Sequence, residues 1–244
     1  MVSNCKKILP LLAEQLYRRR VYFYITIFLI LWPLNIENYP PLLARMHLQR
    51  ESFVKLAALF CSAFYFIAIF IRMISTGYIG RNTVWSSTPI KDTLRYDGPY
   101  QYLRHPIYAG SLIIFCSLAP MCSPYGATFL ILFGGGLTFF LARYEETILE
   151  EHDIQYRNRM SSIPRFIPRR GFLRFLIHEI VPTINNWRVT IVAERYNLAF
   201  GTGFLCFSLS FQKNAFWLGF IISFVLLSGV TFFLRNNQKP PYTA

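Results

Sequence analysis

The 244-residue chain is too apolar for a soluble domain, since 54% of its residues are hydrophobic, 18% are aromatic and only 15% are charged. The formal net charge of +13 is compatible with nucleic-acid binding, but lysine and arginine also mark the cytoplasmic side of membrane proteins. The positions of the basic residues therefore decide between these two classes.

Six apolar stretches approach or reach the roughly 20 residues that a helix needs to cross a bilayer. They are residues 22–34, 53–74, 107–121, 125–142, 198–211 and 215–234. The second and the last are long enough to span, whereas the first, third and fifth are short and could be tilted or partly re-entrant. No small-residue cleavage site follows the first stretch, which argues against a signal peptide. We predict an all-α, polytopic helical membrane protein with about six transmembrane or membrane-embedded helices.

The distribution of positive charge predicts the orientation of these helices. Of the 25 lysines and arginines, 21 lie in segments that a six-helix topology places on one side of the membrane. The positive-inside rule assigns that side, with both termini, to the cytoplasm. Nucleic-acid binding becomes the weaker explanation of the charge. The five cysteines show no metal-like pairing and are interpreted as small buried hydrophobic residues.

Two long basic segments connect the predicted helices on the cytoplasmic side. Residues 72–106 are rich in Gly, Ser, Thr and Pro, which predicts an ordered loop laid against the membrane. Residues 143–197 begin as a continuation of the fourth helix and break at two prolines, where Arg165, Arg169 and Arg170 are expected to attract lipid headgroups. The part from 172 to 197 resembles an interfacial amphipathic helix ended by Pro182.

The stretch "DGPYQYLRHPIYAG", residues 97–110, carries the first candidate site residues. Pro106 suits the first position of a helix, so Arg104 and His105 are expected at a helix N-terminus. Free amides and the positive end of the helix dipole attract an anion there, and the arginine adds a fork that suits a carboxylate or a phosphate. The sequence thus predicts an anion-binding site at the membrane surface.

A pair of acidic residues is expected close to this stretch. The apolar run that begins at residue 107 turns near "APMCSPYG" and returns to "RYEE", with Gly134, Gly135 and Gly136 allowing close approach of the two helices. Such a hairpin brings Glu145 and Glu146 near the Arg-His pair.

Carboxylates are disfavoured at a helix C-terminus, so these two glutamates need a cationic partner. Arg143 or a neighbouring arginine could be that partner, which would make the pair structural. A ligand with a carboxylate and cationic groups would also fit; S-adenosylmethionine is one, and a zwitterionic lipid headgroup meets many of the same requirements.

The motifs resemble those of a known family. "GPYQYLRHPIYAG", then "EETIL" after one helical hairpin, then "QYRNRMSSIPRFIP", are similar to the isoprenylcysteine carboxyl methyltransferase and phospholipid methyltransferase superfamily over residues 77–170. The resemblance implies an integral membrane enzyme that binds S-adenosylmethionine on cytoplasmic loops and methylates a lipidic acceptor from the bilayer.

The resemblance also assigns roles to particular residues. It implies a cofactor pocket made by residues of the RHP motif, which begins with Arg104-His105-Pro106, of the stretch that precedes it, and of the double glutamate Glu145-Glu146. The implied pocket residues are Gly98, Tyr100, His105, Tyr108, Glu145 and Glu146. Arg104 is the candidate for orienting an acceptor carboxylate or closing the pocket, and Arg104 and His105 are the candidate catalytic residues. One departure is His152-Asp153, where family members commonly have Phe-Gly, which puts the local turn in question.

The acceptor is not determined by the sequence. An isoprenylcysteine-type carboxylate is ionised near neutral pH and needs no general base, whereas an amine such as phosphatidylethanolamine must lose a proton, which His105 or a glutamate could accept. A non-catalytic lipid-binding protein is the third hypothesis. No HExxH motif or His-Cys set predicts a metal, and His47 and His178 are interpreted as surface or interfacial residues.

The expected organisation has three parts. Residues 1–75 form N-terminal membrane helices, 76–171 form the methyltransferase core, and 172–244 comprise an interfacial helix and the C-terminal membrane helices.

Overall fold

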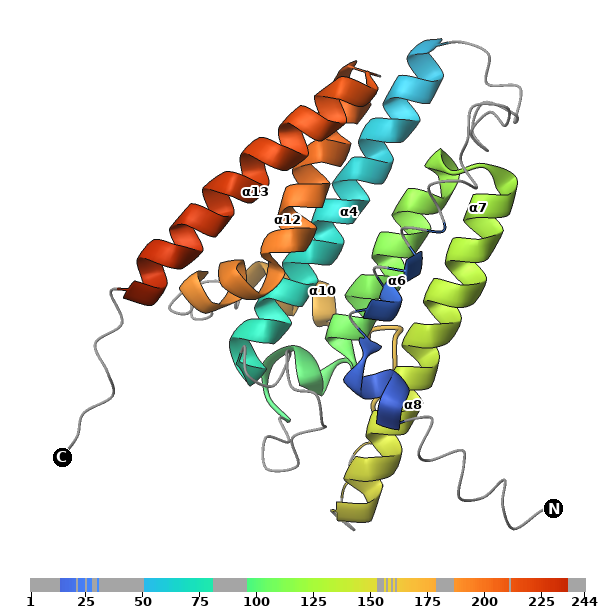
Figure 1. The fold of residues 1–244 in the computed structure, drawn as a ribbon. Helices are drawn as coiled ribbons and strands as arrows, with labels where there is room; N and C mark the ends of the chain where they lie inside the picture. Colours follow the sequence, from blue (N-terminus) through green and yellow to red (C-terminus); the bar gives the residue numbers. More distant parts are fainter. Residues whose placement is uncertain are drawn as a thin grey trace.

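The computed structural model describes residues 14–20, 22–24, 26–27, 30, 51–80, 96–152, 156, 158, 160, 162–178, 187–210 and 212–236. Within these ranges the regular elements are all helical. The long helices lie side by side (Figure 1). In chain order the elements are α4 (Glu51–Ile79), η2 (Gly98–Gln101), α6 (Pro106–Leu118), η3 (Ala119–Met121), α7 (Pro124–Phe129), η4 (Leu130–Gly135), α8 (Gly136–His152), α10 (Phe172–His178), α12 (Trp187–Ser210) and α13 (Lys213–Asn236).

Three of the described helices are long and apolar enough to cross a membrane: Ser52–Ile79, Pro124–Glu151 and Asn214–Phe232. Pro106–Met121 is a shorter apolar helix. A multi-pass helical membrane protein is therefore confirmed, although the number six is not. The first predicted stretch, 22–34, lies mostly outside the described residues.

The predicted boundary of the fifth stretch is wrong. Helix α12 starts at Trp187, eleven residues before the apolar run that begins at Leu198. Its first turns contain charged residues, and one of them, Glu194, is buried against a partner in α4 that hydropathy along the chain does not reveal. Of the predicted interfacial helix over 172–197, the described residues contain α10, residues from Trp187 onward belong to α12, and Pro182 lies outside the described residues.

Helix α4 is the central helix of the described bundle and packs against α6 and α12, while α13 lies along α12 (Figure 1). Small residues allow these contacts to be close. A Cβ atom added at Gly201 of α12 would lie 2.9 Å from the Tyr65 ring of α4, and one at Gly203 would lie 2.8 Å from the Phe216 carbonyl oxygen of α13. Small residues at helix interfaces are typical of membrane bundles.

The predicted hairpin between residues 107 and 142 is present. Ser123 caps α7 by accepting a hydrogen bond from the Gly126 amide at 3.1 Å, and α7, η4 and α8 then form one continuous helical rod that reaches His152. The π-helical segment η4 places Gly134 against α6, where an added Cβ would lie 3.1 Å from the Phe115 ring. The close approach predicted for three glycines is confined to Gly134, because Gly135 has ordinary packing distances and Gly136 faces open space.

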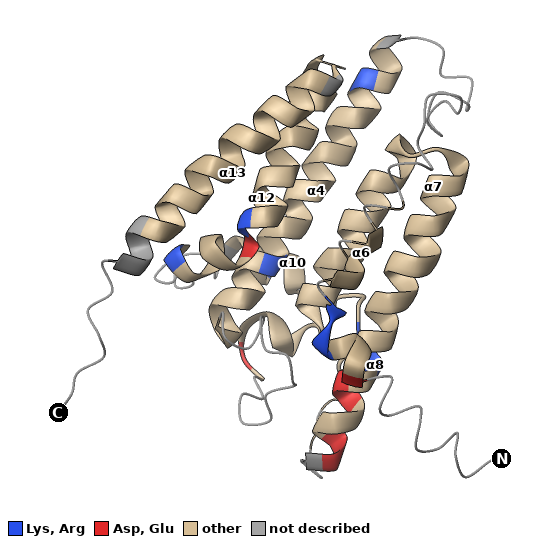
Figure 2. Ribbon diagram, in the orientation of Figure 1, with Lys and Arg blue, Asp and Glu red and all other residues tan. Residues whose placement is uncertain are grey.

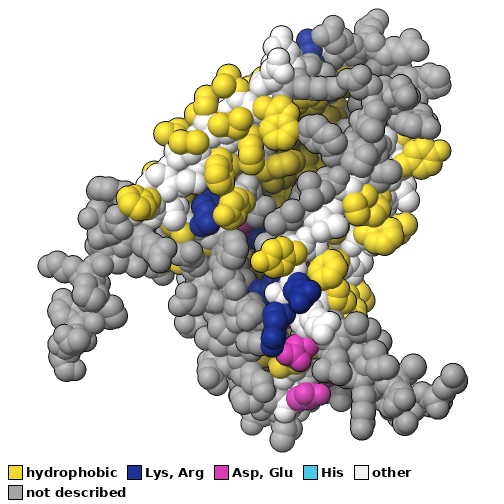
Figure 3. Space-filling model, viewed as in Figure 1, with side chains coloured by type: hydrophobic (Ala, Val, Ile, Leu, Met, Phe, Trp, Pro, Cys, Tyr) yellow, Lys and Arg dark blue, Asp and Glu magenta, His cyan; other side chains and the backbone are white. Residues whose placement is uncertain are grey.

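Charged residues concentrate toward one end of the bundle. Acidic residues gather in the last turns of α8, beside arginines of the N-terminal segment, while Lys55 lies near the opposite end of α4 (Figure 2). Apolar side chains cover the outer faces of the helices, for example Leu218 and Leu226 of α13, each 63% exposed (Figure 3). Such an exposed apolar surface fits a lipid environment.

Candidate active site

The RHP segment connects η2 to α6. Pro106 occupies the first turn of α6, as predicted, and His105 is its N-cap residue with φ −128° and ψ 67°. Gly98 opens η2 with φ +57°, a conformation that residues with a Cβ rarely adopt. The missing Cβ also matters for packing, since it would overlap the ring of Tyr78.

A second segment, residues 163–170, is hydrogen-bonded to the RHP segment through the backbone. The Arg104 amide donates to the Pro164 carbonyl at 2.9 Å, and the His105 amide donates to the Arg165 carbonyl at 3.2 Å. These two amides are therefore used within the protein and do not add to the anion-binding groups expected at this helix N-terminus. Sequence spacing could not reveal a segment sixty residues away that satisfies both donors.

Glu146 is the centre of the charged cluster. Its side chain is 1% exposed, and four cationic or titratable side chains surround its carboxylate. Arg104 Nη1 lies 3.2 Å and His105 Nε2 3.3 Å from Oε1, and Arg143 Nη1 lies 3.1 Å from Oε2. Arg165 Nε contacts both oxygens, at 2.9 and 3.0 Å. Arginines of the protein are therefore the cationic partners of this buried carboxylate. For Glu146, this agrees with the alternative in which neighbouring arginines pair with the glutamates.

The three arginines are not equally buried. The side chain of Arg104 is 16% exposed and also donates from Nε to the Ile163 carbonyl, whereas Arg165 is 34% and Arg143 is 51% exposed. Arg165 was expected to serve lipid headgroups, and its contact with Glu146 corrects that interpretation. Three guanidinium groups around one carboxylate leave an excess of positive charge that favours an anionic ligand nearby.

Glu145 faces a different set of groups, because neighbouring helical residues point about 100° apart. It is half-buried and lies near tyrosines from three parts of the chain. Burial raises the pKa of Tyr100 well above its usual value, and the negative charge of Glu145 raises it further. Burial and the same carboxylate also raise the pKa of Tyr17. These phenols therefore stay protonated at neutral pH and can act only as neutral hydrogen-bonding groups.

The N-terminal segment contributes to this tyrosine-lined side of the site. The ring of Tyr17, which is buried, lies 5.6 Å from the ring of Tyr144, next to Glu145. The guanidinium of Arg20 lies 4.1 Å from the centre of the Tyr17 ring. The sequence motifs did not single out Tyr17 or Arg20, since both precede the resemblance.

Tyr108 and Tyr100, the remaining predicted site residues, contact His105 and helix α4 respectively. The His105 ring is 5.6 Å from the Tyr108 ring and 6.3 Å from the Phe166 ring. Tyr100 donates from its hydroxyl to the Ser75 carbonyl of α4 at 3.5 Å. The structure therefore brings together Arg104, His105 and Glu146 by direct contact. His152 is the last residue of α8, so the helix does not turn before it, and Asp153 lies outside the described residues.

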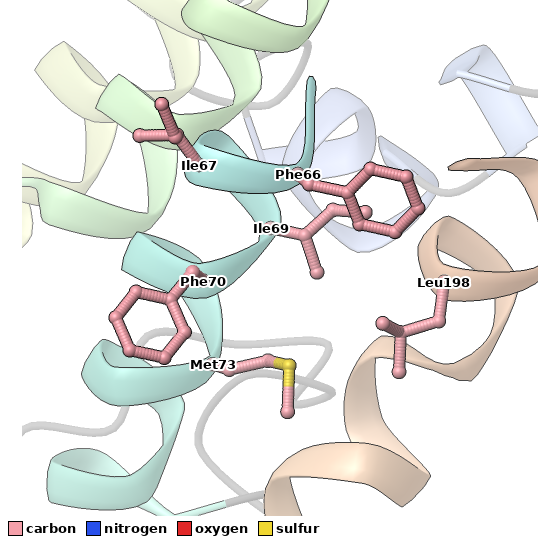
Figure 4. Close-up of a pocket in the computed structure, with 6 residues that line it drawn as sticks. All are labelled: Phe66, Ile67, Ile69, Phe70, Met73 and Leu198. Atoms are coloured by element: carbon pink, nitrogen blue, oxygen red, sulfur yellow. The ribbon is translucent and has the colours of Figure 1, made fainter. Parts of the chain in front are cut away.

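An apolar cavity of about 370 Å³, open to the outside of the bundle, lies between α4 and α12. Phe66, Ile69 and Met73 point across it toward Leu198 (Figure 4). A cavity with this lining can accommodate an apolar chain but offers little to a polar headgroup.

The fold and this polar site together define a helical membrane protein with a charged, aromatic-lined centre at one end of its helices. Residues 54–155 match the family model described as phospholipid methyltransferase. The resemblance found in the sequence is thereby confirmed for this segment, which contains the RHP motif and the double glutamate. The family indicates a membrane methyltransferase that uses S-adenosylmethionine and acts on lipids. No curated protein and no solved structure matches the chain.

Proposed function

We propose that the protein transfers a methyl group from S-adenosylmethionine to a lipidic acceptor with an anionic group, most simply an isoprenylcysteine-type carboxylate. The observation that carries this proposal is the arrangement of the adjacent glutamates, with Glu146 inside an arginine cluster and Glu145 on a tyrosine-lined side. The first side suits an anion and the second suits a cation. A charged donor and a charged acceptor can therefore meet in one polar site.

The residues fit the methyl donor on chemical grounds. Glu145 offers a carboxylate to its ammonium or sulfonium group, and Tyr100, Tyr108 and His105 offer aromatic faces and hydrogen-bonding groups. Gly98 supports this side of the pocket by letting η2 pack on Tyr78. Glu146, in contrast, serves to hold the arginines and His105 in place, because its oxygens are already bonded within the protein.

When bound, S-adenosylmethionine would supply an electrophilic methyl carbon on a positively charged sulfur, and the sulfur would be the leaving group of the transfer. A carboxylate acceptor needs no deprotonation, so the protein's task is to position the two reactants and exclude water. Arg104 is the candidate for orienting the carboxylate, with Arg165 and Arg143 adding positive charge on the same side. The cavity between α4 and α12 offers room for an apolar part of a lipid.

Phospholipid N-methylation is the second candidate, and the description of the matching family favours it. An amine acceptor must lose a proton, and His105 Nε2 or the Glu145 carboxylate would have to accept it. His105 is buried, and its Nε2 lies 3.3 Å from Glu146 Oε1, so this nitrogen already faces a carboxylate and is not directed at an acceptor amine. This geometry makes carboxylate methylation the better supported candidate.

The test begins with donor binding and then compares acceptors. Detergent-purified protein is titrated with S-adenosylmethionine by calorimetry, and radiolabelled methyl transfer is then measured with an isoprenylcysteine and with phosphatidylethanolamine. Transfer that yields a base-labile methyl ester supports the proposal, and transfer to the amine supports the second candidate. A well-folded protein that binds no donor would instead favour the non-catalytic lipid-binding hypothesis.

We further propose that both termini and the polar site face the cytoplasm, as the distribution of lysine and arginine indicates. Cysteine labelling of Cys5 in sealed vesicles, from either side, tests this topology. Labelling from the cytoplasmic side alone supports it.

A further inference from the structure

A buried ion pair joins α4 to α12 outside the motifs that define the candidate active site. Arg72 Nε lies 2.9 Å from Glu194 Oε2, and Arg72 Nη2 lies 2.9 Å from Glu194 Oε1. The side chains are 14% and 0% exposed. Asn197 donates to Glu194 Oε2 at 2.6 Å. Glu194 is thus held in one orientation from its own helix and from α4.

The same guanidinium reaches a third helix. Arg72 Nη1 donates to Ser111 Oγ at 2.6 Å and to the Ile107 carbonyl at 3.2 Å, and both residues belong to α6. A Cβ atom added at Gly110 would lie 2.5 Å from Arg72 Cγ, so the glycine leaves the space that the arginine occupies. The planar fork of an arginine can bond several partners in fixed directions, which apolar contacts cannot do.

These contacts fall on the turn of α6 that belongs to the candidate active site. Ile107 lies between the capping residue His105 and the pocket residue Tyr108. One turn further along α4, the Ser75 carbonyl accepts the hydrogen bond from Tyr100. Helix α4 therefore supports both segments that contribute pocket residues, and Arg72 supports one of them directly.

A charged pair in this environment needs a reason. Ionisable groups among membrane helices are costly unless they are paired, and packed apolar residues often stabilise a fold as well as a buried ion pair. Helix packing alone therefore does not explain Arg72 and Glu194. A role in orienting the first turn of α6 does explain the two residues, because orientation requires directional bonds.

We propose that Glu194 is a positioning residue of the methyl-donor site: it orients Arg72, which fixes the first turn of α6 and with it His105 and Tyr108. This inference rests on the proposed function, since it concerns the donor pocket. It also gives a role to α12, which lies beyond the segment that matches the family model.

The first test compares two buried serines of α6. Ser111→Ala removes one acceptor of Arg72, whereas Ser117→Ala removes a hydroxyl that donates to the Ile114 carbonyl at 2.8 Å and serves as the matched control. The dissociation constant for S-adenosylmethionine is measured by calorimetry, and the melting temperature is measured beside it. We expect Ser111→Ala to weaken donor binding about tenfold, and Ser117→Ala to leave it unchanged, because a lost hydrogen bond to a charged group corresponds to about that factor.

The second test uses Glu194→Gln, with Glu194→Asp as the conservative variant and the exposed Glu151→Gln as control. We expect Glu194→Gln to weaken donor binding more than tenfold in protein that elutes as a folded monodisperse species, and the aspartate to restore part of it. A lower melting temperature with an unchanged dissociation constant, in both Ser111→Ala and Glu194→Gln, would mean that the pair is only structural and would overturn the inference. Absence of donor binding by the wild type would instead overturn the proposed function.

Discussion

Arg165 donates from Nε to both oxygens of the Glu146 carboxylate, at 2.9 and 3.0 Å. This contact fastens the segment that follows α8 to the helix itself. Arg104 and His105 approach the same carboxylate from the RHP segment. One buried glutamate therefore connects three stretches of chain that together form the polar end of the protein.

Glu146→Gln should destabilise the protein markedly. The amide keeps the size of the side chain but leaves three guanidinium groups without their shared anion, and breaking a buried ion pair costs about 3–5 kcal/mol. The arginines are partly exposed, so we expect a loss below this range, about 2–3 kcal/mol. Unfolding in mixed micelles, followed by circular dichroism, measures the loss.

The control is Glu151→Gln, because Glu151 is an exposed carboxylate near the end of the same helix. A surface change of this kind should alter the free energy of unfolding by less than about 0.5 kcal/mol. Equal effects of the two substitutions would contradict the central role of Glu146.

Glu145→Gln should separate binding from stability. Glu145 is half-buried and faces the tyrosine-lined side of the site, where a donor cation is proposed to bind. Loss of its charge should weaken S-adenosylmethionine binding at least about tenfold, since a charge-assisted contact is worth more than the 1.4 kcal/mol that corresponds to this factor. Calorimetry measures the affinity, and the free energy of unfolding should change far less than in Glu146→Gln. Wild-type affinity in this variant would show that the donor does not bind next to Glu145.

The proximity of Glu146 to the RHP motif could be predicted from the sequence for a local reason. A short turn between two apolar helices forces an antiparallel hairpin, and the ends of such a hairpin lie on one side. Ser123 and Gly126 form the cap that begins the return helix, and the capping preference of serine is a property of its side chain. The approach of Arg104 to Glu146 thus follows from chain geometry.

Contacts between distant segments could not be predicted in this way. Arg165 was interpreted as a lipid-facing residue, because nothing in its neighbourhood specifies a partner nineteen positions earlier. Arg72 and Glu194 fall within the two segments predicted as cytoplasmic connections, 72–106 and 143–197, and neither was singled out, since hydropathy averages over a window and hides a single charge that is paired in the bundle. Arginine at the end of a long apolar helix, and glutamate shortly before another, were the available signs of an ion pair.

Gly98→Ala should impair the lead-in to the RHP motif. The backbone at this position has φ +57°, and the new methyl group would overlap the ring of Tyr78. Strain of this kind costs about 1–3 kcal/mol. Gly136→Ala is the opposite case, because no atom lies within 4 Å of the new methyl group and the residue is helical. That substitution should stabilise the protein by about 0.5–1 kcal/mol. Two melting temperatures that both fall, or both rise, would contradict this assignment.

Phe175→Ala should release α10 from the RHP segment without unfolding the bundle. The Phe175 ring is 5% exposed and lies 5.4 Å from the ring of Tyr102, whose carbonyl accepts a hydrogen bond from the Arg169 amide. A buried phenylalanine truncated to alanine costs about 3–5 kcal/mol in a cooperative core. Helix α10 has only seven residues, so local opening limits the loss and leaves the melting temperature almost unchanged.

Hydrogen exchange measures this local opening. Amides of residues 165–178 should exchange faster in Phe175→Ala, and those of α4 should keep wild-type protection. Leu173→Ala is the control on the same helix, because Leu173 is 71% exposed and its truncation removes little packing within the protein. Uniformly faster exchange in α4 and α10 would show that the aromatic contact stabilises the whole bundle, since an amide of α4 is exposed only when the helices separate.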